Sequence, residues 1–183
     1  MNTTVRVHRL TIAAVLSAIG IIIPMFSPLK IILEPASFTL ASHVPIFIAM
    51  FISPITALSV SVITTAGFFF GGFPLVIVLR AATHVIFALC GALILRNRKQ
   101  WLDSIPKMLL FSFVLSFVHA VCEVLIVTPF YVGNSLKEAF YTQGFMVSVL
   151  LLVGVGTIIH SMVDFFIALL IWKPLRKMKS LSA

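Results

Sequence analysis

Long apolar runs separated by short polar connections occupy most of the chain. The runs cover residues 7–25, 38–52, 55–70, 74–95, 107–130 and 143–172. A helix needs roughly 20 apolar residues to cross the hydrocarbon of a bilayer. The second and third runs are shorter and meet at Ser53-Pro54, where the missing N–H of proline disfavours one continuous helix. The pattern predicts a single all-α transmembrane domain over residues 1–183, with six spanning helices.

The composition agrees with a polytopic membrane protein. Of the 183 residues, 61% are apolar and 10% are charged, whereas soluble domains carry about 45–50% and about 25%. The formal net charge of +8 would suggest a nucleic-acid partner in a soluble protein, but the basic residues here cluster at the ends of apolar runs. The composition therefore excludes a soluble enzyme, a secreted disulfide scaffold and a disordered tail, and we expect no nucleic-acid partner.

The basic residues predict the orientation in the membrane. If the N-terminus is cytoplasmic, two basic residues, Lys30 and Lys137, lie in outer connections. Ten basic residues then lie in the inner segments: Arg6, Arg9, Arg96, Arg98, Lys99, Lys107, Lys173, Arg176, Lys177 and Lys179. Because positive residues collect on the cytoplasmic side, both termini are predicted to be cytoplasmic.

The outer segment 26–37 is unusual for a connection between two spans. It contains SPLKIILEPAS, which is partly apolar, carries Lys30 and Glu34, and is bracketed by Pro28 and Pro35. A simple turn would be shorter and more polar. Two interpretations remain open: a lid folded over the bundle, or an interfacial loop resting on lipid headgroups.

Seven ionisable residues fall within the apolar runs. Each costs at least about 2.5–3.5 kcal/mol to insert, so each needs a partner or a function. Six of them form pairs spaced by four residues, which places both members on one helical face. The pairs are Arg80/His84, His119/Glu123 and His160/Asp164, and the seventh residue is His43. Helices four, five and six therefore each present a polar stripe to the bundle interior.

Depth estimates place most of these residues at one level. At a rise of about 1.5 Å per residue, Arg80 and Glu123 lie about 9–10 Å below the outer surface and His84 and His119 about 15–16 Å below it. His43 falls near the outer mouth. We predict that these five residues line a substrate-binding site in the outer half of the membrane.

The same count places His160 and Asp164 about 25–30 Å along helix six, in the inner half. Two interpretations apply to this pair. It is a polar tie deep in the bundle, or it belongs to a proton relay in an autonomous carrier.

The predicted site has both a ligand-binding and a structural interpretation. The fork of donors on Arg80 suits a carboxylate or a phosphate, and Glu123 would hold Arg80 or accept a ligand N–H. Alternatively, Arg80 and Glu123 only neutralise each other. His84 and His119 can donate or accept according to tautomer. Phe73 could stack on a flat heterocycle, although packing at the membrane interface is its ordinary role.

Metal and catalytic signatures are missing from the sequence. Each i, i+4 pair joins a histidine to an arginine or a carboxylate, never to a second histidine. There is no HExxH motif and no GxSxG motif. Four histidines and two carboxylates could ligate zinc, so a membrane metalloenzyme is a third possible class, but we expect no catalytic residues and no metal site.

Helix one carries Ala14 and Ala18 in the small-xxx-small pattern AVLSA, which permits close helix approach. Together with the six helices, the short chain and the first outer segment, this resembles the substrate-binding (S) components of energy-coupling factor vitamin transporters. The runs EPASFTLASHVPIFIAMFISP (34–54) and GFFFGGFPLVIVLRAATH (67–84) are most similar to the niacin-type members.

The resemblance implies a cell-membrane protein that captures a small water-soluble vitamin from outside. It implies that Ala14 and Ala18 dock on an EcfT-type transmembrane coupling subunit, and that two partner ATPases hydrolyse the ATP, so this chain needs no cofactor. Niacin or nicotinamide is the expected ligand. Pyridoxine or a thiamin pyrimidine precursor remains open because Glu123 lies level with Arg80, and an autonomous proton-coupled carrier is the alternative class.

Overall fold

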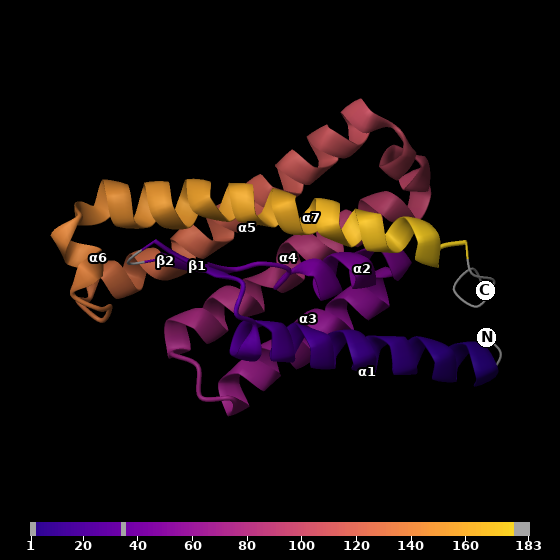
Figure 1. Cartoon of the computed structure of the whole chain (residues 1–183), viewed down its shortest axis with the longest axis horizontal. Coiled ribbons are helices and arrows are strands. Elements are labelled where there is room, and N and C mark those ends of the chain that lie inside the picture. Colours follow the sequence, from indigo (N-terminus) through magenta and orange to yellow (C-terminus); the bar gives the residue numbers. More distant parts are fainter. Residues whose placement is uncertain (1–2, 34–35, 178–183) are drawn as a thin grey trace.

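The computed structural model describes residues 3–33 and 36–177, and it shows a helical bundle with one two-stranded hairpin (Figure 1). The elements in chain order are α1 (Thr3–Phe26), β1 (Lys30–Leu33), β2 (Ala36–Thr39), α2 (Val44–Ile52), α3 (Pro54–Phe70), α4 (Leu75–Arg98), η1 (Lys99–Asp103), α5 (Ile105–Val132), α6 (Ala139–Thr142), η2 (Met146–Val155) and α7 (Gly156–Leu175). The segment η2 is π-helical and continues directly into α7.

The short helix α2 forms the centre of the bundle. Its residues from Val44 to Phe51 are all buried, and it packs against α1, α3, α4 and α7. A helix that is apolar on every side is either packed inside a protein core or surrounded by lipid, and α2 is packed inside the core. With nine residues, α2 is too short to cross a bilayer without the segment before it.

The boundaries of α2 follow from its flanking residues. The second helix was predicted to begin at residue 38, but residues 38 and 39 belong to β2. Pro45 in the first turn suits a helix start because proline lacks only an N–H that would have no helical partner there. The predicted break is confirmed: the Ser53 side chain accepts a hydrogen bond from the Thr56 N–H and caps α3.

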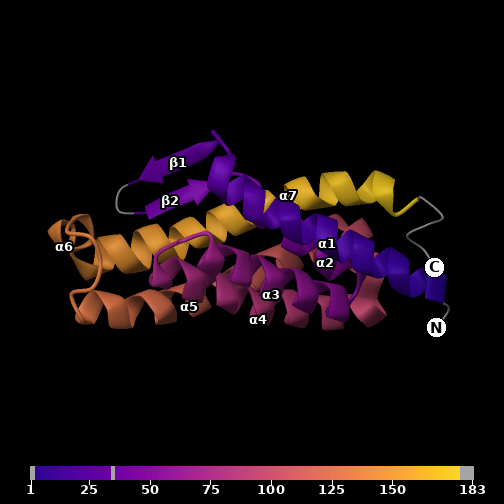
Figure 2. The same cartoon turned by 90° about the horizontal axis from the view of Figure 1, so that it is seen from below.

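The outer segment 26–37, predicted as a loop, contains the strand β1 and the start of β2, while the other elements of the described chain are helical, as the all-α class predicted. Strands β1 and β2 are antiparallel, with Lys30 opposite Thr39 and Leu33 opposite Ala36. The apolar, β-branched sequence favours extended backbone, and pairing the strands satisfies N–H and C=O groups near the membrane. The hairpin lies over one side of the helices (Figure 2). Glu34 lies outside the described residues.

Four helical segments of the described chain are long and apolar enough to cross a membrane: Val7–Phe26, Leu75–Asp103, Ile105–Val132 and Met146–Leu175. The apolar helix α3 is shorter. The start of α1 and the end of α7 lie at the same end of the bundle (Figure 1). The protein is therefore a polytopic, predominantly helical membrane protein.

Glycine allows three helices to meet near Gly91 of α4. A Cβ atom at this position would lie 2.2 Å from Sδ of Met50 in α2 and 2.9 Å from Cδ1 of Leu115 in α5. Real Cβ atoms do not approach other atoms so closely, so a larger residue would force the Met50 and Leu115 side chains out of their present positions. The buried Gly154 of η2 is different, because its nearest neighbour would be Cγ2 of Val124 at 3.4 Å.

Gly91→Ala should therefore lower the thermal unfolding temperature in detergent, since overpacking a close contact costs about 1–3 kcal/mol. Gly154→Ala is the matched control and should melt at or slightly above the wild-type temperature, because alanine loses less backbone entropy on folding. Tryptophan fluorescence during heating measures both. Equal melting of Gly91→Ala and wild type would show that α2, α4 and α5 do not meet at this glycine.

Candidate functional site: a buried polar cavity

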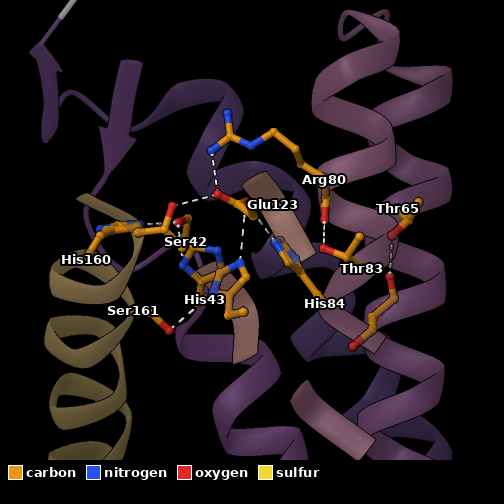
Figure 3. A network of polar contacts seen from close by, with 12 residues as sticks. Ser42, His43, Thr65, Arg80, Thr83, His84, Glu123, His160 and Ser161 are labelled. Carbon is orange, nitrogen blue, oxygen red and sulfur yellow. Dashed lines mark hydrogen bonds and ion pairs between the residues drawn. The ribbon is translucent and has the colours of Figure 1, made fainter. Parts of the chain in front are cut away.

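A cavity of about 180 Å³ lies between the hairpin and the helices. Its polar wall combines side chains from five places in the fold: Lys30 of β1, Ser42 and His43 before α2, Arg80 and His84 of α4, Glu123 of α5, and Thr157 and His160 of the last helix. Figure 3 shows this network at close range. The cavity is thus lined by five of the six residues predicted to bind substrate: His43, Phe73, Arg80, His84 and Glu123. The sixth, His119, is fully buried, with its ring centroid 4.8 Å from those of His43 and His84.

Glu123 is the central acceptor in the first part of the polar network. Its Oε2 accepts a hydrogen bond of 2.8 Å from Nη2 of Arg80 and one of 2.6 Å from Oγ1 of Thr157. Its Oε1 lies 3.4 Å from Nε2 of His119 and 3.9 Å from Nε2 of His84. The Glu123 carboxylate is only 3% exposed, so the pairing with Arg80 compensates a charge that would be costly alone.

Arg80 retains hydrogen-bonding capacity beyond this pair. Its side chain is 21% exposed and borders the cavity. Its Nε is buried and has no hydrogen-bond partner among the described residues. An unmet donor beside a cavity is expensive unless a ligand or water satisfies it.

Asp164 is the central acceptor in the second part of the polar network. Its carboxylate accepts hydrogen bonds from the backbone N–H of Ala41 at 2.8 Å and of His43 at 2.9 Å, and it lies 3.1 Å from Nδ1 of His43. Ala41 has φ of 67°, a left-handed conformation that costs free energy for a residue with a Cβ. Asp164 therefore holds the strained turn between β2 and α2 against α7.

The predicted depth of the His160/Asp164 pair is wrong. Nε2 of His160 lies 3.1 Å from Oγ of Ser42, its ring centroid is 5.0 Å from that of His43, and it lines the cavity. The last helix extends well past α3 and α4 at its η2 end (Figure 1). Counting from residue 143 as though it lay at the membrane surface therefore placed the pair too deep.

His43 is likewise not at an outer mouth but inside a cluster of imidazoles. Its ring centroid is 4.8 Å from those of His84 and His119 and 5.0 Å from that of His160. The rings of His84 and His119 are also 4.8 Å apart. The residues before His43 form β2 and a turn, so His43 enters the bundle from the side of the hairpin.

Several site residues were missed by the sequence reasoning, among them Thr157 and Ser161. Thr157 donates to Glu123, and Oγ of Ser161 lies 3.3 Å from Nδ1 of His119. A signal was available, because Thr157, His160, Ser161 and Asp164 follow the i, i+3, i+4, i+7 spacing of one helix face. The polar stripe of the last helix is thus longer than the single pair that was recognised.

Aromatic side chains form the apolar wall. Phe73 stacks on Phe68 with a centroid distance of 4.6 Å and an interplanar angle of 18°, and both line the cavity. Phe38 of β2 lies over Gly156, where a Cβ atom would come within 2.6 Å of its ring. The hairpin is therefore seated directly on the backbone of the last helix.

The two predicted docking alanines lie elsewhere. Ala14 and Ala18 are exposed on α1, whereas Ala13, Leu16 and Ser17 of the same helix are buried. The small-residue face is thus separate from the cavity and open at the outside of the bundle.

The chain is 43% identical over 164 residues to the niacin transporter NiaX of Lactococcus lactis subsp. cremoris strain MG1363, across 90% of this chain and 72% of that protein. The chain belongs to the niacin-transporter family. No family model matches, and no solved structure matches. The family confirms the predicted niacin-type resemblance, the multi-pass location in the cell membrane, and a role in transport and not in enzymatic catalysis.

Asp164→Asn should lower the unfolding temperature markedly, because hydrogen bonds to a buried charged group contribute about 1.5–3 kcal/mol each. An amide offers only one acceptor oxygen to the Ala41 and His43 donors. Asp103→Asn is the control: Asp103 is half-exposed, and its Oδ1 accepts a 2.6 Å hydrogen bond from Nη2 of Arg176. Exposed pairs contribute at most about 1 kcal/mol. Similar melting of both variants would contradict the anchoring role of Asp164.

Proposed function

We propose that this chain is the substrate-binding subunit of an energy-coupling factor importer, and that it captures niacin or nicotinamide from outside the cell. An EcfT-type coupling subunit and two ATPase subunits would complete the transporter. The ATPases would hydrolyse the ATP, and this chain would use no cofactor for capture. Membership of the niacin-transporter family supports the proposal.

The observation that carries the ligand assignment is the unsatisfied Nε of Arg80 beside a small cavity. A guanidinium binds a carboxylate through parallel N–H donors. The volume of about 180 Å³ is below the roughly 300–1,000 Å³ of a drug-sized pocket, so a single aromatic ring fits its scale. The ring would lie against Phe68 or Phe73, and Lys30 at the hairpin would add a second positive charge.

The Arg80–Glu123 pair bears on the choice among vitamins. A neutral or cationic ligand such as pyridoxine or a thiamin pyrimidine precursor would need Glu123 as its acceptor. Both carboxylate oxygens of Glu123 already face Arg80, Thr157, His84 and His119, and little of the group is exposed. The unmet Nε donor of Arg80, beside a carboxylate whose Oε2 already accepts two hydrogen bonds, favours a ligand that accepts hydrogen bonds.

The proposed topology has six crossings with both termini cytoplasmic. The start of α1, the end of α7 and the basic segment from Arg96 to Lys99 lie at one end of the bundle (Figure 1). A surface groove there is lined by Arg9, Ser53 and Arg96, which places the α2–α3 junction at the same end. The hairpin and the cavity lie toward the opposite end, where an external ligand would enter.

Arg80→Ala should weaken niacin binding at least about thirtyfold and nicotinamide binding much less, because truncating one partner of a buried charged hydrogen bond costs about 2–5 kcal/mol. Calorimetry on purified protein measures both ligands. The double variant Arg80→Met/Glu123→Gln removes both charges and controls for an orphaned carboxylate, and it should show the same preference for the amide. Equal losses for the acid and the amide would assign Arg80 a purely structural role.

Ala14→Trp and Ala18→Trp should abolish uptake by the reconstituted complex while leaving niacin binding unchanged, since a bulky side chain prevents close helix approach. Leu125→Trp places the same residue on an exposed position of α5 and should transport normally. Normal transport by the alanine variants would refute the docking assignment. Uptake driven by a proton gradient without partner subunits would support the autonomous carrier instead.

A further inference from the structure

We propose that His43, His84 and His119 form a binding site for one divalent transition-metal ion of the zinc type at the floor of the cavity. The three imidazoles come from the start of α2, from α4 and from α5. All three side chains are buried, and each offers one ring nitrogen within 4.8 Å of the other two.

The spacing is close to that of a metal site. Zinc binds histidine nitrogens at about 2.0–2.1 Å, which separates two nitrogens of a tetrahedral site by about 3.3 Å. Closing the cluster to this spacing takes shifts of roughly 1 Å in the rings. Three packed helices supply the ligands, so the backbone need not move.

Two of the imidazoles already have the outer partners that metal ligands require. Nδ1 of His43 lies 3.1 Å from the Asp164 carboxylate, and Nδ1 of His119 lies 3.3 Å from Oγ of Ser161. A metal-bound histidine usually donates its second ring N–H to such a group, which fixes its tautomer and aims the other nitrogen at the ion. Here that other nitrogen is Nε2 in both residues.

An unsatisfied atom marks the centre of the cluster. Nε2 of His119 is buried and has no hydrogen-bond partner among the described residues. Oε1 of Glu123 is 3.4 Å from this nitrogen and 3.9 Å from Nε2 of His84. These separations exceed ordinary hydrogen bonds of about 2.7–3.2 Å but approach the spacing between ligands of one ion.

The charges of the network favour a cation at this point. Glu123 and Asp164 are both buried, and Glu123 pairs with Arg80. Asp164 is surrounded by backbone N–H groups, Ser42 and histidines, so the described residues give it no permanent cation. A divalent ion bound by His43, His84 and His119 would offset the negative charge of Asp164, which contacts the His43 imidazole.

A second group, His43 with His160 and Asp164, also has a spacing suited to metal ligands. Its carboxylate is already committed to the backbone of Ala41 and His43, so the three-histidine group is the better site. For an ion bound by His43, His84 and His119, the fourth ligand would be Glu123 or, if the proposed function holds, the carboxylate of the vitamin. Only this last role rests on the proposed function.

The test is titration of Co²⁺ into the full chain, purified without a polyhistidine tag, treated with chelator and dialysed. We expect saturation near one ion per chain, with visible absorption of a tetrahedral site, and displacement by Zn²⁺. His84→Ala and His119→Ala should each lose at least tenfold in affinity. His8→Gln removes a histidine outside the cluster and should bind like wild type.

Ser161→Ala provides a milder variant if a histidine variant fails to fold, and it should weaken Co²⁺ binding by about tenfold, the lower end of the loss that follows removal of an outer partner. Absence of saturable binding, or equal binding by wild type and His119→Ala, would overturn the site. Niacin calorimetry on chelated and Zn²⁺-loaded protein separates the two proposals. If the protein binds metal but not niacin, only the assignment of niacin as its ligand is refuted. If it binds niacin but not metal, only the metal site of His43, His84 and His119 is refuted.

Discussion

The structure depends on one constraint: a polar group inside a membrane protein must find its partners within the protein. Two buried carboxylates meet this constraint by collecting donors from several elements. Glu123 of α5 accepts hydrogen bonds from Arg80 of α4 and Thr157 of α7. Asp164 of α7 accepts hydrogen bonds from the backbone N–H groups of Ala41 and His43, in the turn before α2. Because each carboxylate joins elements far apart in sequence, satisfying them fixes how the helices sit around the cavity.

The turn between β2 and α2 shows the consequence. Ala41 adopts a left-handed conformation, which the chain would avoid without the Asp164 acceptor. Once held, the turn starts the central helix in a position where His43 meets three other imidazoles. The same turn leads into β2, whose Phe38 sits on Gly156. The hairpin, the central helix and the site are therefore positioned by a single carboxylate.

The cavity and the small-residue face of α1 lie apart in the fold. The inner face of α1 is buried through Ala13, Leu16 and Ser17, while Ala14 and Ala18 face outward. The cavity is lined by the hairpin, the segment before α2, α3, α4, α5 and the last helix, and also by Pro24 near the end of α1 and Ile46 of α2. Under the proposed function, the cavity would hold the ligand while the exposed face of α1 contacts a partner.

The sequence by itself determined the apolar segments, the break at Ser53-Pro54, the polar faces of three helices and the level shared by Arg80 and Glu123, because these follow from periodicity and helical rise. It also identified the family. Only the tertiary structure decided that residues 30–33 pair with residues 36–39 as strands, that His160 and Asp164 join the network around Arg80 and Glu123, and that four histidines converge. Helical spacing reports which residues share one face of one helix. It does not report how far each helix extends past its neighbours, and that offset decides which polar faces meet.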